Sequence, residues 1–72
     1  MRTLKDYRMK AKLSVDRLAA LADVNRQTVM KAEKGNAIQE LNARKIIEAL
    51  NEKLPLDWQL SIENAPIKIY QP

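Results

Sequence analysis

The sequence contains no cysteine and no histidine among its 72 residues. Without cysteine, the chain can form neither a disulfide framework nor a thiolate metal site. Without histidine, it lacks the commonest catalytic base and the commonest metal ligand in proteins. No pair of carboxylates has a spacing that suggests an enzyme site. We therefore expect no catalytic residue, no metal, no cofactor and no small-molecule substrate.

Aromatic residues and long apolar runs are also scarce. There is no Phe, one Trp and two Tyr, so the core must consist of Leu, Ile, Val, Ala and Met. A chain of this length folds as one domain and buries roughly 60% of its unfolded surface. The longest stretch without a charged residue has five residues, whereas a membrane span needs about 20. Because Met1 leads directly into charged sequence, we expect no secretory signal, no membrane association and a cytoplasmic location.

The net charge of +4 is distributed unevenly. Residues 1–35 hold nine Lys and Arg against four Asp and Glu, a net +5, whereas residues 36–72 hold four against five, a net −1. A basic half indicates a polyanionic partner such as nucleic acid. An excess of lysine on an ordinary solvated surface gives the same balance, and charge alone slightly favours this second interpretation.

Four segments show the apolar spacing of short helices. The first 54 residues contain no proline and one glycine, a composition that permits several helices. Thr3, Ser14 and Asn25 each precede such a segment and can cap it. Gly35 follows the third segment, where a left-handed C-terminal cap is expected. Asn42 begins the fourth, which ends near residue 53. The sequence therefore predicts a mainly α fold.

A different period follows Pro55. Apolar and polar residues alternate from Leu56 to Glu63, the pattern of a half-buried strand. A turn at 64–66 can then lead into a second alternating stretch at 67–69. The sequence predicts a short C-terminal β-hairpin here. The alternative is one helical turn capped by Ser61, with only residues near 67–70 extended. In either form, the segment must pack on the helices or on a dimer partner.

The stretch LSVDRLAALADVNRQTVMKAEKG, residues 13–35, joins two of the short helices by a tight turn. Ala19 is small enough to let the two helix backbones approach closely, and Asp23 tolerates the left-handed conformation that the turn needs. Val29 anchors the second of these helices from within. The arrangement is a helix-turn-helix, and the residues expected to point outward are Arg26, Gln27, Met30 and Lys31.

These residues resemble the XRE/Cro-like helix-turn-helix regulators, the lambda-repressor-like family, whose usual run is similar to LSxxxLAxxxGVSxxTISxxExG. The matches in register are Leu13, Ser14, Leu18, Ala19, Val24, Thr28, Val29, Glu33 and Gly35. The resemblance covers residues 3–51. It implies a bundle of four to five short helices in a DNA-binding domain at 1–54, followed by a C-terminal extension at 55–72. Lys12 and Asp23 stand where the family often has Gly, and Val15 stands where it commonly has a DNA-contacting Gln.

The resemblance also implies roles for individual residues. The helix at about residues 25–34 would enter the major groove of double-stranded DNA and read base edges. Base contacts are expected from Arg26, Gln27 and Lys31. Phosphate or positioning contacts are expected from Asn25, Thr28, Lys12, Arg17, Lys34 and Asn36. Arg8 and Glu33 are expected to form a structural ion pair between the first and third helices.

We therefore expect a repressor-like transcription regulator that acts by occupying a specific DNA site, as a possible homodimer. The alternative is an antitoxin-type or protein-interaction module whose partner surface is the tail at residues 56–70. An acidic or apolar outward face on the third helix would favour the alternative. The face in this chain is basic and polar, which favours DNA binding.

Overall fold

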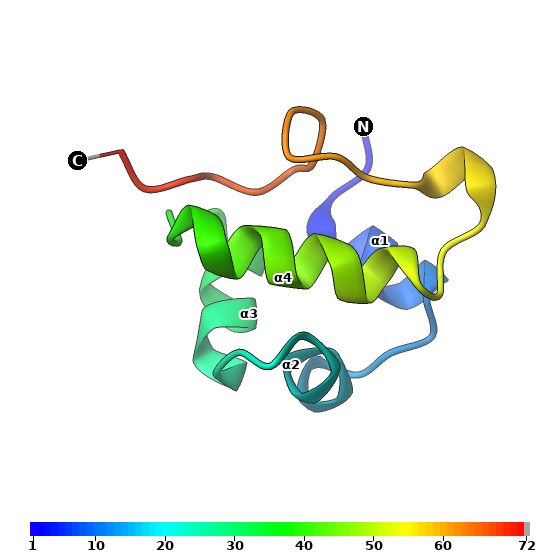
Figure 1. Ribbon diagram of the computed structural model, residues 1–72, viewed down its shortest axis with the longest axis horizontal. Coiled ribbons are helices and arrows are strands. Elements are labelled where there is room, and N and C mark those ends of the chain that lie inside the picture. The colour runs from blue at the N-terminus through cyan, green and yellow to red at the C-terminus, as the bar shows by residue number, and fades with distance from the viewer. Residues whose placement is uncertain (72) are drawn as a thin grey trace.

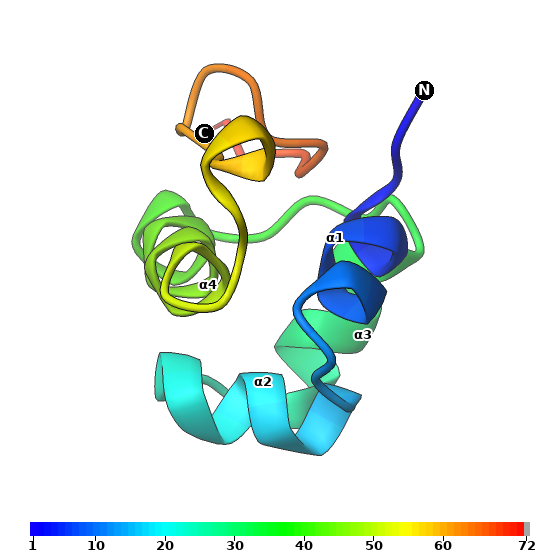
Figure 2. The same ribbon diagram turned by 90° about the vertical axis from the view of Figure 1, so that its right-hand side faces the viewer.

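The computed structural model describes residues 1–71 and has four α-helices in this part of the chain. They are α1 (Leu4–Lys10), α2 (Val15–Ala22), α3 (Arg26–Glu33) and α4 (Glu40–Asn51), followed by a 3-10 turn, η1 (Leu56–Trp58). Helix α2 lies on one side of α4, and the chain after α4 runs back along its other side (Figures 1 and 2). The predicted mainly α bundle of four to five short helices is confirmed.

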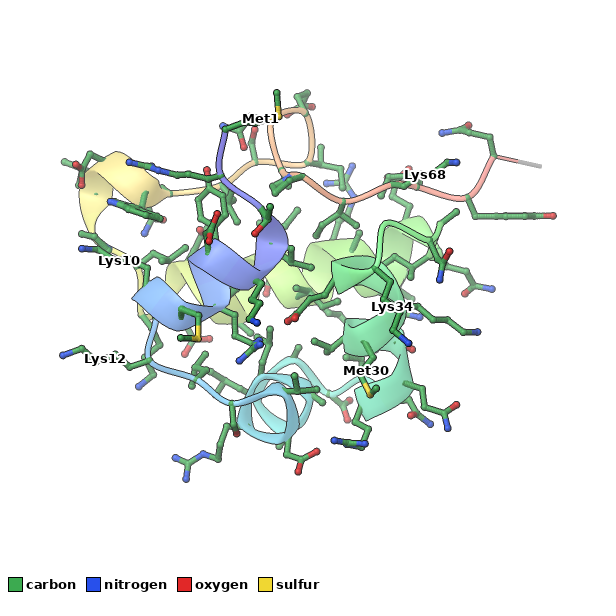
Figure 3. The ribbon with its side chains drawn as sticks, turned by 180° about the vertical axis from the view of Figure 1, so that it is seen from behind. Met1, Lys10, Lys12, Met30, Lys34 and Lys68 are labelled. Carbon is green, nitrogen blue, oxygen red and sulfur yellow. The ribbon has the colours of Figure 1, made fainter. Side chains whose placement is uncertain are left out.

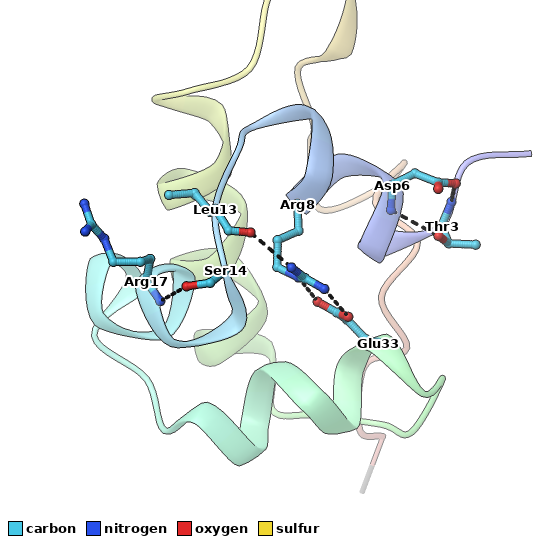
Figure 4. Close-up of polar contacts among 7 residues, drawn as sticks. All are labelled: Thr3, Asp6, Arg8, Leu13, Ser14, Arg17 and Glu33. Atoms are coloured by element: carbon cyan, nitrogen blue, oxygen red, sulfur yellow. Dashed lines mark hydrogen bonds and ion pairs between the residues drawn. The ribbon is translucent and has the colours of Figure 1, made fainter.

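The first three helices begin directly after the predicted capping residues. The Thr3 hydroxyl accepts a bond from the Asp6 N–H at 3.2 Å, and the Asp6 carboxylate accepts one from the Thr3 N–H at 2.8 Å (Figure 4). This reciprocal capping box holds the pKa of Asp6 below its usual range, because the Thr3 N–H favours the ionised carboxylate. Ser14 and Asn25 cap α2 and α3 with bonds of 3.1 and 2.9 Å.

Helix α4 starts two residues before the predicted Asn42, at Glu40. Its N-cap, Gln39, makes no side-chain capping bond, so the sequence carries no capping signal at the true start. The turns match expectation more closely. Asp23 lies in the left-handed region at φ 57°, as predicted, and Gly35 does so at φ 86°. Lys12, where the family often has Gly, is also left-handed, at φ 60°.

The core lies where α2, α3 and α4 meet. Leu18, Val29, Ile46 and Leu50 are completely buried there. Ala19 of α2 is 4% exposed and belongs to the same core. The packing leaves little room for larger side chains and holds the two helices of the helix-turn-helix against α4.

The predicted C-terminal β-hairpin is wrong. Residues Leu56–Trp58 form the 3-10 turn, and residues 61–65 form a second turn. Ser61 and Asn64 cap this second turn mutually, with side-chain-to-backbone bonds of 2.9 and 3.3 Å. Leu56, which a half-buried strand would turn inward, is 90% exposed. The capped turn at Ser61 was the alternative interpretation of the sequence.

Side-chain amides join the segment after η1 to the end of α4. The Asn51 amide donates to the Leu60 carbonyl at 2.9 Å and accepts from the Leu60 N–H at 2.8 Å. The Gln59 amide donates to the carbonyls of Asn51 and Leu54. Because its backbone is held in this way, Leu60 is only 6% exposed and joins the same core as the helices.

Beyond residue 66, the chain pairs with the connection between α3 and α4. Ile38 and Ile69 form an isolated parallel β-bridge, in which the Tyr70 N–H donates to the Ile38 carbonyl at 2.7 Å. Trp58 connects the tail to α1. Its ring packs edge-on against Tyr7 at 5.4 Å between centroids, and the Arg2 guanidinium lies over it at 3.4 Å. Such cation–π contacts add to the stability of half-buried aromatic residues.

Replacing Asn51 by Ala is predicted to lower the free energy of unfolding by about 2 kcal/mol, since both backbone groups of Leu60 lose their partner. Chemical denaturation followed by circular dichroism measures this change. Lys53 is exposed and lies two residues further along the chain, so Lys53→Ala serves as the control. Its free energy of unfolding is expected to stay within about 0.5 kcal/mol of the parent value. Equal stability of the two variants would contradict this account of the tail.

Candidate nucleic-acid interface

Helix α3 has one buried face and one exposed face. Val29 and Ala32 are 0% and 2% exposed, so they anchor the helix in the core. Arg26, Gln27 and Lys31 are exposed on the other side of the helix. The three residues expected to contact bases therefore face solvent together.

The outer side of α3 is hollowed. Gln27, Met30, Lys31, Lys34 and Asn36 line a shallow depression there. Met30 is half-buried and adds an apolar side chain to the lining of this depression (Figure 3). Two of the expected base-contacting residues thus share one surface with two of the expected phosphate-contacting residues.

The other candidate residues lie in different places. Asn25 caps α3. Thr28 is half-buried and lines a second hollow with Lys31, Asn42 and Tyr70, so the end of the tail reaches the side of α3. Lys12 lies at the opposite end of the molecule from Lys34 (Figure 3). Arg17 points away from α3 (Figure 4) and lines a separate hollow with Leu21 and Lys53. Neither Lys12 nor Arg17 joins the cluster on α3.

Arg8 and Glu33 form a nearly buried ion pair between α1 and α3 (Figure 4). The Arg8 Nε donates to Glu33 Oε2 at 2.5 Å, and Nη2 donates to Oε1 at 3.2 Å. Nη1 donates to the Leu13 carbonyl at 3.0 Å. The two side chains are only 11% and 13% exposed. This bidentate pair holds the end of α3 against both α1 and the α1–α2 turn.

A second ion pair involves a residue that the sequence did not single out for this surface. Arg26 Nε donates to Asp16 Oδ1 at 2.6 Å, linking the first turn of α3 to the first turn of α2. Both side chains are well exposed, at 57% and 72%. Asp16 is not among the residues expected to contact DNA, because no local pattern in the sequence indicates a contact across ten residues and a turn.

Within residues 1–71, no three His, Cys, Asp or Glu side chains converge on a metal-binding geometry. In the same part of the chain, no helix has the length and apolar character needed to cross a membrane. The depression on α3 is lined by the amides of Gln27 and Asn36 and the cations of Lys31 and Lys34.

Two tightly joined helices, the second presenting a polar and basic face, define a helix-turn-helix DNA-binding domain. A family model described as Helix-turn-helix matches residues 4–58. The chain belongs to this family, the XRE/Cro and lambda-repressor-like helix-turn-helix proteins, which are DNA-binding regulators. Comparison with curated proteins and with solved structures gave no significant match.

Replacing Glu33 by Ala is predicted to destabilise the fold by about 3 kcal/mol, because the buried Arg8 guanidinium loses its counter-ion. Thermal and urea unfolding provide the measurement. Glu40→Ala is the matched control, since Glu40 forms an exposed i,i+4 pair with Arg44, and it is expected to cost less than about 1 kcal/mol. A loss at Glu33 as small as that at Glu40 would show that the pair does not hold α3 in place.

Proposed function

We propose that this protein binds double-stranded DNA at a specific sequence and regulates transcription by occupying that site. The observation that supports the proposal is the two-sidedness of α3. Its apolar residues anchor it in the core, while its amide and cationic side chains project together into solvent. A helix presented in this way fits the width of the major groove.

In this proposal, Arg26, Gln27 and Lys31 contact base edges. Arg and Lys match the two acceptors of guanine, whereas Gln matches the donor and acceptor of adenine. Each good bidentate contact supplies about 1–3 kcal/mol of discrimination. The shared hollow places Gln27 and Lys31 beside each other, so neighbouring base pairs would be read together.

The remaining candidate residues would position the protein on the DNA backbone. Lys34 and Asn36 flank the base-contacting surface, and Asn25 lies at the N-terminus of α3. Thr28, Lys12 and Arg17 would make more peripheral contacts with phosphates. Such contacts give affinity without sequence preference, and each neutralised phosphate makes binding more sensitive to salt.

We further propose that the protein acts as a repressor, by excluding polymerase from the site that it occupies. Two copies would bind palindromic half-sites centred about one helical turn, roughly 34 Å, apart. This geometry requires a homodimer on DNA, with the tail at residues 55–72 contributing to stability or to dimer contact.

The second candidate is a protein-interaction or antitoxin-type module. The observation in its favour is the exposure of two large apolar side chains on the tail, Leu56 at 90% and Tyr70 at 62%. In this case, a protein partner would cover the tail, and the exposed face of α3 would have no role in DNA binding. Selection of bound duplexes from random DNA separates the two candidates.

Selection of bound duplexes from a random DNA pool is expected to enrich one palindromic sequence. Enrichment would establish specificity, dimeric binding and half-site spacing in a single measurement. The Arg8–Glu33 pair must stay intact, so the unmodified chain is used, with a folded variant lacking Arg26, Gln27 and Lys31 as the control. Failure to enrich any sequence would contradict the proposed function and favour the protein-interaction candidate.

Gln27→Ala and Lys34→Ala are predicted to weaken DNA binding in different ways. Gln27→Ala should reduce affinity for the selected site by about 1–3 kcal/mol and relax preference at one base pair. Lys34→Ala should weaken binding to all duplexes alike and reduce the slope of log affinity against log salt by about 0.9. Titrations at several salt concentrations measure both effects. If Gln27→Ala weakened selected and random duplexes equally, Gln27 would be a phosphate contact.

A further inference from the structure

We propose that Asp16 is a positioning residue that orients the Arg26 guanidinium for base reading. The inference rests on the proposed function of α3 and adds to it a residue from the other helix of the motif. Asp16 lies in the first turn of α2 and Arg26 in the first turn of α3. Their ion pair is a direct side-chain link between these two helices at the exposed surface.

The geometry of the pair leaves the reading edge of Arg26 available. Asp16 accepts only from Nε, at 2.6 Å. Within residues 1–71, the Nη1 and Nη2 groups of Arg26 make no protein hydrogen bond that meets ordinary distance and angle limits. These two groups form the end of the planar fork, which can donate in parallel to the two acceptors of guanine. Asp16 therefore bonds the Nε–H of Arg26 and leaves the Nη1 and Nη2 groups available to donate to a base.

Stability does not account for this pair. Both side chains are more than half exposed, and exposed ion pairs contribute little to folding. An aspartate beside the DNA-facing helix would also repel phosphates. Arg26 neutralises this carboxylate, and in return Asp16 restricts a long, flexible side chain. Ordering that side chain before DNA arrives lowers the entropy lost on binding and disfavours alternative contacts with other bases.

The test compares Asp16→Asn with Glu63→Gln, which changes net charge equally on the exposed turn after η1. Both are measured for affinity on the selected duplex and on one in which the guanine assigned to Arg26 is replaced. Asp16→Asn is expected to reduce discrimination at this guanine by about fivefold, whereas Glu63→Gln should leave it unchanged. In an Arg26→Ala background, Asp16→Asn should have no further effect on discrimination.

A readout in the protein without DNA tests the contact itself. The Arg26 Nε–H resonance should exchange more slowly with water in the parent than in Asp16→Ala, which leaves no acceptor at this position, while the melting temperature changes little. If Asp16→Asn alters affinity equally on both duplexes, Asp16 acts only through charge and the inference is overturned. If no duplex is selected at all, the proposed function fails as well. If Gln27→Ala relaxes base preference but Asp16→Asn does not, only the role of Asp16 is wrong.

Discussion

The nearly buried ion pair between Arg8 and Glu33 is the interaction on which the rest of the structure depends. Aliphatic packing is close to non-directional, so a core of Leu, Ile, Val and Ala specifies the rotation of each helix only weakly by itself. Arg8 adds direction, since its three bonds reach two atoms of Glu33 and the Leu13 carbonyl. The end of α3 is thereby tied to α1 and to the entrance of α2.

The orientation of α3 determines which of its side chains reach solvent. With Val29 and Ala32 held inside, the period of the helix places Arg26, Gln27 and Lys31 outside. Asp16 then joins Arg26 across the motif. One buried ion pair therefore fixes the placement of α3, and one exposed ion pair links a side chain of α3 to α2. The two pairs resemble each other chemically but differ in burial and therefore in their effect on stability.

The tail shows how a small domain completes its core. Leu60 is buried because Asn51 bonds both of its backbone polar groups, so that a single side chain replaces a strand partner. Trp58 rests against Tyr7 of α1, and Ile69 bridges to Ile38. These contacts bind the segment after α4 to three separate parts of the chain. They also bring Tyr70 to the side of α3, beside Thr28 and Lys31.

Local signals in the sequence were sufficient for the caps at Thr3, Ser14 and Asn25, for the left-handed turn at Asp23, and for the outward face of α3. Each depends on residues within one turn of one another, where side-chain chemistry and helical period act directly. The hairpin prediction from the alternating pattern after Pro55 was wrong for the opposite reason. It records which side chains are apolar, but the backbone conformation there depends on Asn51 and Gln59, whose bonding partners are set by the end of α4. The contact of Asp16 with Arg26 likewise required the folded crossing of α2 and α3, because an interaction across a turn leaves no periodic trace in the chain.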